Sequence, residues 1–564
     1  MFKEISKLNH KLSSYKYTTI SKAELIDGVN SLDNFIILKS DDKFTIYDRN
    51  CDHMGGKIIT RNNIHECPVH KWRFDALKGK YTNGFKKKRI KDFEIKNKKI
   101  IVREKKITPT ITQIINKNNK GRVKIRFINH ACLTVEAEDF KFATDPWAIG
   151  PAFNTGWWLK YKSKEDWIEE INSCSFIYIS HNHPDHLHPL TLSKIDKKIP
   201  IIVPNFISGA TFKFIEELGF KRIIKLDFAK EYRFKQTNLI ISILKSGDFR
   251  EDSGIYFSIG KFTALFDVDS NMINFNKIPN VDFYASSFAG GSSGYPLCFE
   301  NYTDKEKNEI ILKSKNFLKF KKIKIFNEAK IKYFLPYAGF FQEKLHRDKK
   351  IFKFNKKNTI EDYELIAKKS KFKILNIEKF DEFYFENKKL VKSSNNKNKF
   401  YKDLDKETYL NYFKNSYSNI DVDYIKEYFL NSNFNDNLTL FIRLTDDNFK
   451  KNFLSIKINF NNDTSFEILK NFKISKGKET DSKVIYMLCR KESFLNTLYN
   501  KCSWEDLSIG FQCRITRYPN LYNAKFWNHF TNNYVLEKNI KVNKECNSCE
   551  SIKQFFDNQI QSIT

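Results

Sequence analysis

Two clusters of cysteine and histidine in the first half of the chain contain the residue types that bind metal ions. The first is Cys51-Asp52-His53, separated by thirteen residues from Cys67-Pro68-Val69-His70. Two thiolates and two imidazoles on paired loops can hold a 2Fe-2S cluster, with Cys51 and Cys67 on one iron and His53 and His70 on the other. A structural zinc site is the alternative, but zinc modules do not normally combine this spacing with an all-β host.

The second cluster follows a short apolar segment, FIYIS, that we expect to be a strand. It reads His181-Asn182-His183-Pro184-Asp185-His186. Imidazoles two residues apart at a strand end point the same way and can share one metal ion, while Asp185 and His186 turn toward a second position. We therefore expect a second metal site, separate from the first.

The second cluster resembles that of the metallo-β-lactamase superfamily, whose members usually take a further ligand from a later strand, and this resemblance implies Asp248 as the third ligand. Asp248 lies four residues before Asp252 in a segment that ends in the apolar run GIYFSI. Together, His181, His183 and Asp248 would form the two-histidine, one-carboxylate set of non-haem Fe(II) sites that use O₂. The alternative is that Asp248 is an exposed turn residue.

The elements that must position these clusters fall into three units. Residues 1–104 contain short strands broken by Gly and Asn turns, which predicts a small all-β unit. Residues 122–390 alternate strand and helix, with a capping box at Ser163–Asp166 expected to open one helix. Residues 401–564 form a third, smaller α/β unit to which no role is assigned.

Composition limits the classes of protein to consider. The 564 residues carry a net charge of +31 and are 41% hydrophobic, which excludes a disordered chain. The lysines are spread over every segment, including an expected helix at 304–323, so we predict solvated faces and no nucleic-acid site. A basic surface would attract anionic substrates and acidic proteins. No apolar run is long enough for a membrane span, and ten cysteines are too few for a disulfide framework, so we expect a cytoplasmic protein.

Several motifs together resemble a known family. The first cluster resembles the Rieske 2Fe-2S pattern, and the second, with Asn129-His130 and Asp145-Pro146-Trp147 upstream, resembles the metallo-β-lactamase superfamily. A chain that combines the two is similar to the CMP-N-acetylneuraminate hydroxylase (monooxygenase) family. The resemblance extends to DPWAIGPAF (145–153), GWWL (156–159), FAGGSSGYP (288–296), PYAGF (336–340), IGFQ (509–512) and FWNHF (526–530).

This resemblance implies a fold, a site and partners. The fold would be an all-β Rieske domain, then an α/β metallo-β-lactamase-like four-layer sandwich, then the small α/β domain. Asp269 would bridge two metals, and His181, His183, Asp185 and His186 would be the catalytic ligands. His130, Asp145 and His346 would be supporting or alternative ligands. Asp248 stands where the superfamily usually has a histidine.

The implied activity is hydroxylation of the N-acetyl methyl group of CMP-N-acetylneuraminate, or of a related nucleotide-linked acetamido sugar, to the N-glycolyl form. The second site would hold iron, mononuclear or dinuclear, with zinc possible. Electrons would pass from NADH through a reductase and a small acidic carrier, a ferredoxin or a b-type cytochrome. Two alternatives remain: a metal-dependent hydrolase with a regulatory Rieske domain, and an electron carrier whose sandwich is a docking scaffold.

Overall fold

The computed structural model describes residues 1–52, 58–67, 72–82, 84–115, 121–137, 140–206, 208–246, 251–270, 280–368, 371–474 and 483–533. These residues form two eight-stranded sheets, one five-stranded sheet and four smaller sheets. No helix among them is both long enough and apolar enough to cross a membrane.

The amino-terminal unit consists of three small antiparallel sheets, as its sequence predicts. Ile36, Ile37 and Ile46 are completely buried, Ile36 in one core cluster and Ile37 and Ile46 in another, because successive side chains of a strand point to opposite faces. The strands are β3 (Gly28–Ser31), β4 (Phe35–Ser40) and β5 (Lys43–Asp48); β6 (Ile59–Arg61), β7 (Ile64–Glu66), β8 (Arg73–Asp75) and β9 (Lys80–Tyr81); and β10 (Phe93–Lys96), β11 (Lys99–Thr110) and β2 (Asn9–Ser21).

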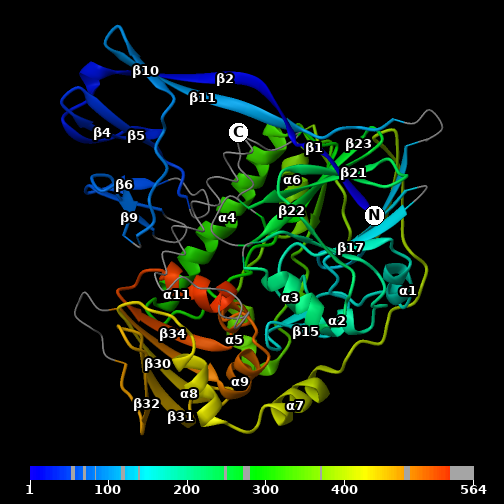
Figure 1. Ribbon diagram of the computed structural model, residues 1–564, viewed down its shortest axis with the longest axis vertical. Coiled ribbons are helices and arrows are strands. Elements are labelled where there is room, and N and C mark those ends of the chain that lie inside the picture. Colours follow the sequence, from blue (N-terminus) through cyan, green and yellow to red (C-terminus); the bar gives the residue numbers. More distant parts are fainter. Residues whose placement is uncertain are drawn as a thin grey trace.

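Two strands connect this unit to the rest of the protein. Strand β11 runs on to Thr110, beyond the predicted boundary at residue 104, because it pairs with β2 along its whole length. Strand β1 (Phe2–Lys7) pairs with a strand of the central unit, Phe2 lying opposite Phe234. In Figure 1 the β2–β11 ribbon joins the small sheets to the central unit.

The central unit is a sandwich of two mixed sheets. Phe142 and Tyr178 from one sheet and Phe257 and Phe266 from the other share one hydrophobic core. The first sheet runs β1, β20 (Lys230–Phe234), β21 (Leu239–Lys245), β22 (Ser253–Ile259), β23 (Phe262–Val268), β24 (Phe283–Ser287), β25 (Tyr333–Tyr337), β27 (Lys373–Ile374). The second runs β19 (Ile223–Leu226), β18 (Ile201–Pro204), β17 (Phe176–Tyr178), β14 (Phe140–Thr144), β13 (Cys132–Ala137), β12 (Arg122–Asn129), β28 (Glu382–Glu386), β29 (Lys389–Ser394).

Helices cover the outer face of each sheet, which gives the four layers expected from the sequence. Helices α1 (Trp167–Asn172), α2 (Pro189–Ser193) and α3 (Ala210–Glu217) pack on the second sheet through Trp167, Leu192 and Ile215. Helices α4 (Asp304–Glu328) and α6 (Ile360–Ala367) cover the first sheet (Figure 1). Smaller elements of the unit are β15 (Pro151–Ala152), β16 (Trp157–Leu159), β26 (Phe341–Gln342) and α5 (Lys349–Phe354).

The carboxyl-terminal unit is a five-stranded sheet with helices, which agrees with the α/β class predicted for it. The sheet runs β32 (Ser465–Leu469), β31 (Asn452–Asn459), β30 (Leu438–Thr445), β33 (Lys483–Arg490), β34 (Cys513–Tyr518). Its helices are α7 (Lys406–Ser416), α8 (Val422–Leu430), α9 (Lys491–Tyr499), α10 (Glu505–Ile509) and α11 (Ala524–Asn528). Its core is continuous with Trp147 and Trp157 of the central unit.

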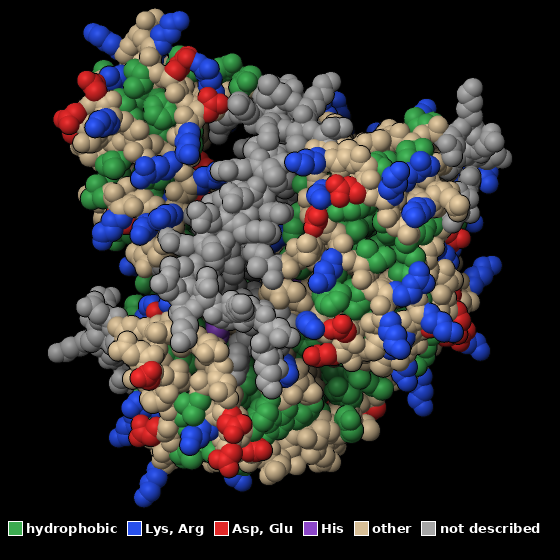
Figure 2. Space-filling model, viewed as in Figure 1, with side chains coloured by type: hydrophobic (Ala, Val, Ile, Leu, Met, Phe, Trp, Pro, Cys, Tyr) green, Lys and Arg blue, Asp and Glu red, His purple; other side chains and the backbone are tan. Residues whose placement is uncertain are grey.

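Two expectations about helices were wrong in part. The Ser163–Asp166 capping box does not form, because Ser163 donates to the carbonyl of Ala148 and Asp166 accepts from Arg126. Helix α4 instead begins with a capping box at Thr303. Its lysines are not all solvated, since Lys321 and Lys322 are buried. Elsewhere, lysines and arginines are scattered over the face shown in Figure 2, with acidic side chains between them.

Candidate metal centre and its cavity

The histidine loop follows β17 and brings its first two imidazoles to one side of the sandwich. Nε2 of His181 lies 2.9 Å from Nδ1 of His183 and 3.9 Å from Oδ1 of Asp252. Asp252 comes directly before β22. Ligand atoms of His181, His183 and Asp252 therefore converge on one point.

A second set of donors adjoins the first. His186 Nε2 is 3.3 Å from Oδ2 of Asp185 and 3.7 Å from Oδ2 of Asp269. His130, at the end of β12, places Nε2 3.1 Å from the same oxygen of Asp185. The rings of His181 and His186 are 4.3 Å apart, so the two sets of donors are neighbours.

These donors fit a bound cation. His186 Nε2 and Asp185 Oδ1 are buried and have no hydrogen-bond partner among the described residues, although burying such atoms unpaired is costly. Burial lowers the pKa of His181 well below its usual value, so this imidazole is neutral, as a ligand must be. Imidazole and carboxylate donors together suit iron or zinc.

Asp145 supports this loop from behind. Its Oδ1 accepts from the backbone N–H of Ser180 at 2.7 Å, and its Oδ2 lies 3.3 Å from Nδ1 of His186. A carboxylate on the far nitrogen fixes the tautomer and orientation of a ligating imidazole. Burial raises the pKa of Asp145. Burial alone would lower the pKa of His186, but the carboxylates of Asp185 and Asp145 raise it well above the usual range.

One acidic residue at this centre comes from the carboxyl-terminal unit. Oε2 of Glu505, the first residue of α10, is 3.6 Å from Nε2 of His183. Burial alone would lower the pKa of His183, but Glu505 and Asp252 raise it to about 9. This position of α10 requires glycines: a Cβ on Gly294 would lie 2.1 Å from the carbonyl of Ser508, and one on Gly510 2.1 Å from that of Phe153. The glycines thus allow the two units to approach closely.

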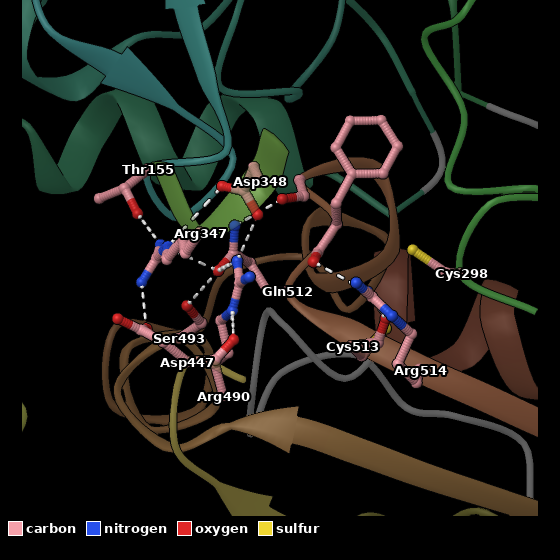
Figure 3. A network of polar contacts seen from close by, with 12 residues as sticks. Thr155, Cys298, Arg347, Asp348, Asp447, Arg490, Ser493, Gln512, Cys513 and Arg514 are labelled. Carbon is pink, nitrogen blue, oxygen red and sulfur yellow. Dashed lines mark hydrogen bonds and ion pairs between the residues drawn. The ribbon is translucent and has the colours of Figure 1, made fainter. Parts of the chain in front are cut away.

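A buried polar network fixes the carboxyl-terminal unit to the central unit (Figure 3). Arg490 Nη1 is 2.8 Å from Oδ1 of Asp348, and both side chains are 1% exposed. Oε1 of Gln512 accepts from Arg490, Arg347 and Ser493. Thus Gln512 of the IGFQ motif joins two guanidinium groups from different units.

A cavity of about 260 Å³ opens onto the metal donors. Its lining includes His183, Asp185 and Asp269 from the central unit and Glu505 from the carboxyl-terminal unit. Trp72 of the amino-terminal unit also lines it and stacks on Tyr522, with ring centroids 6.4 Å apart. All three units therefore meet at this cavity.

The first cluster motif lies close to Trp72. Cys51 and Cys67 are buried in one hydrophobic core with Trp72, and the N–H of Cys67 donates to the carbonyl of Trp72 at 2.8 Å. His53 and His70 lie outside the described residues. Their part in a cluster stays a prediction.

Other predicted residues have different outcomes. Asp248 lies outside the described residues, and Asp252, which was not selected as a ligand, lies beside His181 and His183. His346 is exposed and belongs to no group of metal donors among the described residues. Glu505 had no signal in the sequence beyond its place just before the IGFQ motif. No sequence spacing connects it to His183.

The comparisons with known proteins agree with this geometry. Residues 18–94 match the Rieske [2Fe-2S] domain, and residues 124–260 match the beta-lactamase superfamily domain. Cytidine monophosphate-N-acetylneuraminic acid hydroxylase of Xenopus laevis is 28% identical over 88% of this chain and 88% of its own length. The similarity to this hydroxylase extends over most of both chains. The hydroxylase of Pongo pygmaeus is 28% identical over 91% of this chain and 93% of its own, and that of Mus musculus 27% identical over 93% and 96%.

The similarity to these hydroxylases favours the main interpretation of the sequence over the hydrolase alternative. It also accounts for the combination of a Rieske domain with a metallo-β-lactamase-like sandwich in one chain. The similarity extends into the carboxyl-terminal unit, because the matches cover about nine-tenths of the chain.

Proposed function

We propose that this protein is a Rieske-dependent monooxygenase that hydroxylates the N-acetyl methyl group of CMP-N-acetylneuraminate or a closely related nucleotide sugar. The observation that carries the proposal is the cavity, which is lined both by metal donors of the sandwich and by Trp72 beside the Rieske cysteines. A methyl C–H bond is too inert for acid–base residues, so the reaction needs a redox metal and a source of single electrons.

The proposed reaction balances with two electrons. Substrate, O₂, two electrons and two protons give the N-glycolyl product and one water. Iron bound by His181, His183, Asp252, Asp185, His186 and Asp269 would supply O₂ activation. Cys51, Cys67, His53 and His70 would hold the 2Fe-2S cluster that receives the electrons.

The chain's own residues position the reacting groups. Asp145 accepts from the N–H of Ser180, and Ser180 Oγ lies 2.9 Å from Nδ1 of His181, so these two residues fix the orientation of the histidine loop. Trp157 and Phe341 stack with ring centroids 3.4 Å apart and form an apolar wall of the cavity. Such a wall suits the methyl group and limits access of water.

The electron source is part of the proposal. We infer that NADH supplies the electrons through a reductase and a small acidic carrier, a ferredoxin or a b-type cytochrome. The net charge of +31 supports an acidic partner, because opposite charges speed association. The cytoplasm is the proposed location, where such carriers and CMP-sugars meet.

Product analysis tests the proposed function. Purified protein is given NADH, a reductase, the carrier, O₂ and CMP-N-acetylneuraminate, and the N-glycolyl product is measured by mass spectrometry. We expect product only with the complete electron chain, and none from His181→Ala or Cys51→Ala. Turnover without reductant would instead support the hydrolase alternative, in which a metal-activated water attacks the substrate.

A further inference from the structure

Arg517 is a buried cation on the wall of the cavity. It lies on β34, is 5% exposed, and contributes to the cavity lining. Its backbone N–H donates to Asn301 Oδ1 at 3.0 Å, and its carbonyl accepts from Asn301 Nδ2 at 3.0 Å. Its Nε donates to Asn520, and its guanidinium lies 4.5 Å from the ring centroid of Phe299. The side chain is therefore held in place.

The groups that hold Arg517 are all neutral. Besides Asn520 and Phe299, its neighbours are the phenols of Tyr295, Tyr302 and Tyr522. Its Nη1 is buried without a hydrogen-bond partner in the described part of the chain, and no carboxylate there forms an ion pair with it. A buried cation without a counter-charge is strongly disfavoured. A ligand that carries negative charge would supply what is missing.

More cations line the same cavity. Lys315 and Lys321 lie on one face of α4, together with Ser314 and Leu318, because residues three and four apart in a helix are neighbours. Lys356 adds a third ammonium group. Lys315 also lies 3.6 Å from Asp362, which leaves part of its charge available to a ligand.

The glycine-rich loop 290–293 borders this cation-lined region of the cavity, which we call the cationic pocket (Arg517, Lys315, Lys321 and Lys356). Gly290 and Gly291 have φ of 70° and 74°, a conformation that glycine adopts readily. Asn355 donates to the carbonyl of Gly291 at 3.0 Å and fixes the loop.

We propose that the cationic pocket binds the carboxylate and the phosphodiester of the nucleotide sugar, with Arg517 as the central anion-binding residue. This inference rests on the proposed function. In CMP-N-acetylneuraminate both anionic groups are attached to the same ring carbon, on the side of the sugar away from the acetamido group. With the methyl group at the metal donors, both anions point away from the metal. A ligand with two anionic groups on one carbon accounts for a cluster of several cations better than a ligand with a single anionic group would.

Equilibrium binding without reductant tests the proposal, because no turnover is then needed. Titration calorimetry of the full-length protein measures the affinity for CMP-N-acetylneuraminate, for CMP and for free N-acetylneuraminate. CMP carries only the phosphate and free N-acetylneuraminate only the carboxylate, so these two ligands test the anionic groups separately. We expect Arg517→Met to weaken CMP-N-acetylneuraminate binding by about 10- to 100-fold, the strength of a charge-assisted bidentate contact. The affinity of Arg517→Lys should lie between those of the wild type and Arg517→Met. The affinity of the wild type should decrease as the salt concentration increases.

Matched variants separate recognition from folding. Arg514→Met removes a half-buried arginine on the same strand that is not in the cavity lining, and Lys313→Met removes an exposed lysine of α4. Neither should change binding. The double variant Lys315→Met/Lys356→Met removes charges from less buried positions. If Arg517→Met fails to fold, this double variant tests whether the cationic pocket binds the nucleotide sugar. Iron, sulfide and the midpoint of thermal unfolding are measured for each variant.

The outcomes distinguish this inference from the proposed function. Unchanged affinity in Arg517→Met and in the double lysine variant, with tight binding by the wild type, would overturn the cationic pocket and leave the hydroxylase proposal standing. No binding of CMP-N-acetylneuraminate, but Arg517-dependent binding of another anionic nucleotide sugar such as UDP-N-acetylglucosamine, would keep the pocket and correct the substrate.

Discussion

Oε2 of Glu505 lies 3.6 Å from Nε2 of His183, although the two residues are in different units of the chain. The carboxyl-terminal unit therefore places a carboxylate beside the candidate metal centre. Supporting carboxylates typically change metal affinity by about 10- to 100-fold. We expect Glu505→Gln to lower the affinity of the sandwich site for iron by a factor in that range, measured by competition with a chelator. Glu492→Gln, in α9 of the same unit, is the control and should bind iron like the wild type.

Asp252 and Asp248 can be separated by a pair of substitutions. Asp252→Asn should reduce the metal content of the sandwich while acid-labile sulfide stays at the wild-type level, because Asp252 lies with His181 and His183 and not with the Rieske cysteines. The sequence alone favours Asp248, so Asp248→Asn is tested in parallel. Full metal content in Asp252→Asn, with loss in Asp248→Asn, would restore the prediction made from the sequence.

The buried pair of Arg490 and Asp348 should hold the carboxyl-terminal unit in place. Removing one partner of a buried ion pair leaves an uncompensated charge and costs about 3–5 kcal/mol. Arg490→Met should therefore lower the free energy of unfolding by that amount, as measured with denaturant. Lys450→Met changes an exposed residue of the same unit and should have no measurable effect. A matching small effect in both variants would show that the network contributes little.

Stability at acid pH should depend on His529. Burial lowers the pKa of this side chain to about 4, although its Nε2 lies 2.8 Å from the carbonyl oxygen of Ser432. The unfolded state therefore binds a proton near pH 6.5, whereas the folded state does so only near pH 4. The stabilising effect is complete above pH 6.5 and is lost as the pH falls toward 4, by roughly 2–3 kcal/mol at pH 4.5. His529→Gln should lose less stability than the wild type between pH 7 and 4.5; parallel pH curves would contradict this.

The sequence predicts those parts of the site that are close together in the chain. The His181–His186 loop directly follows an apolar strand, so its residues and their approximate directions can be inferred from local order alone. The three-unit organisation follows from the change between period-two and mixed patterns.

The remaining parts depend on contacts between distant segments. Asp252 becomes a donor only because β22 pairs with β21 and begins beside the histidine loop, where Ser253 Oγ donates to the carbonyl of Ser180. Glu505 reaches His183 only because Gly294 and Gly510 allow backbones far apart in the chain to touch. The sequence predicts that the lysines of α4 are solvated, because the cavity beside them is formed by residues that are distant in the chain.

Isotope labelling tests the central claim most directly. The complete system is supplied with ¹⁸O₂ in ordinary water, and the N-glycolyl product is analysed by mass spectrometry. A monooxygenase that uses this metal centre should place one ¹⁸O atom in the new hydroxymethyl group of each product molecule and consume one NADH per product. An oxygen atom that comes from water, or product formed without O₂, would contradict the proposed function.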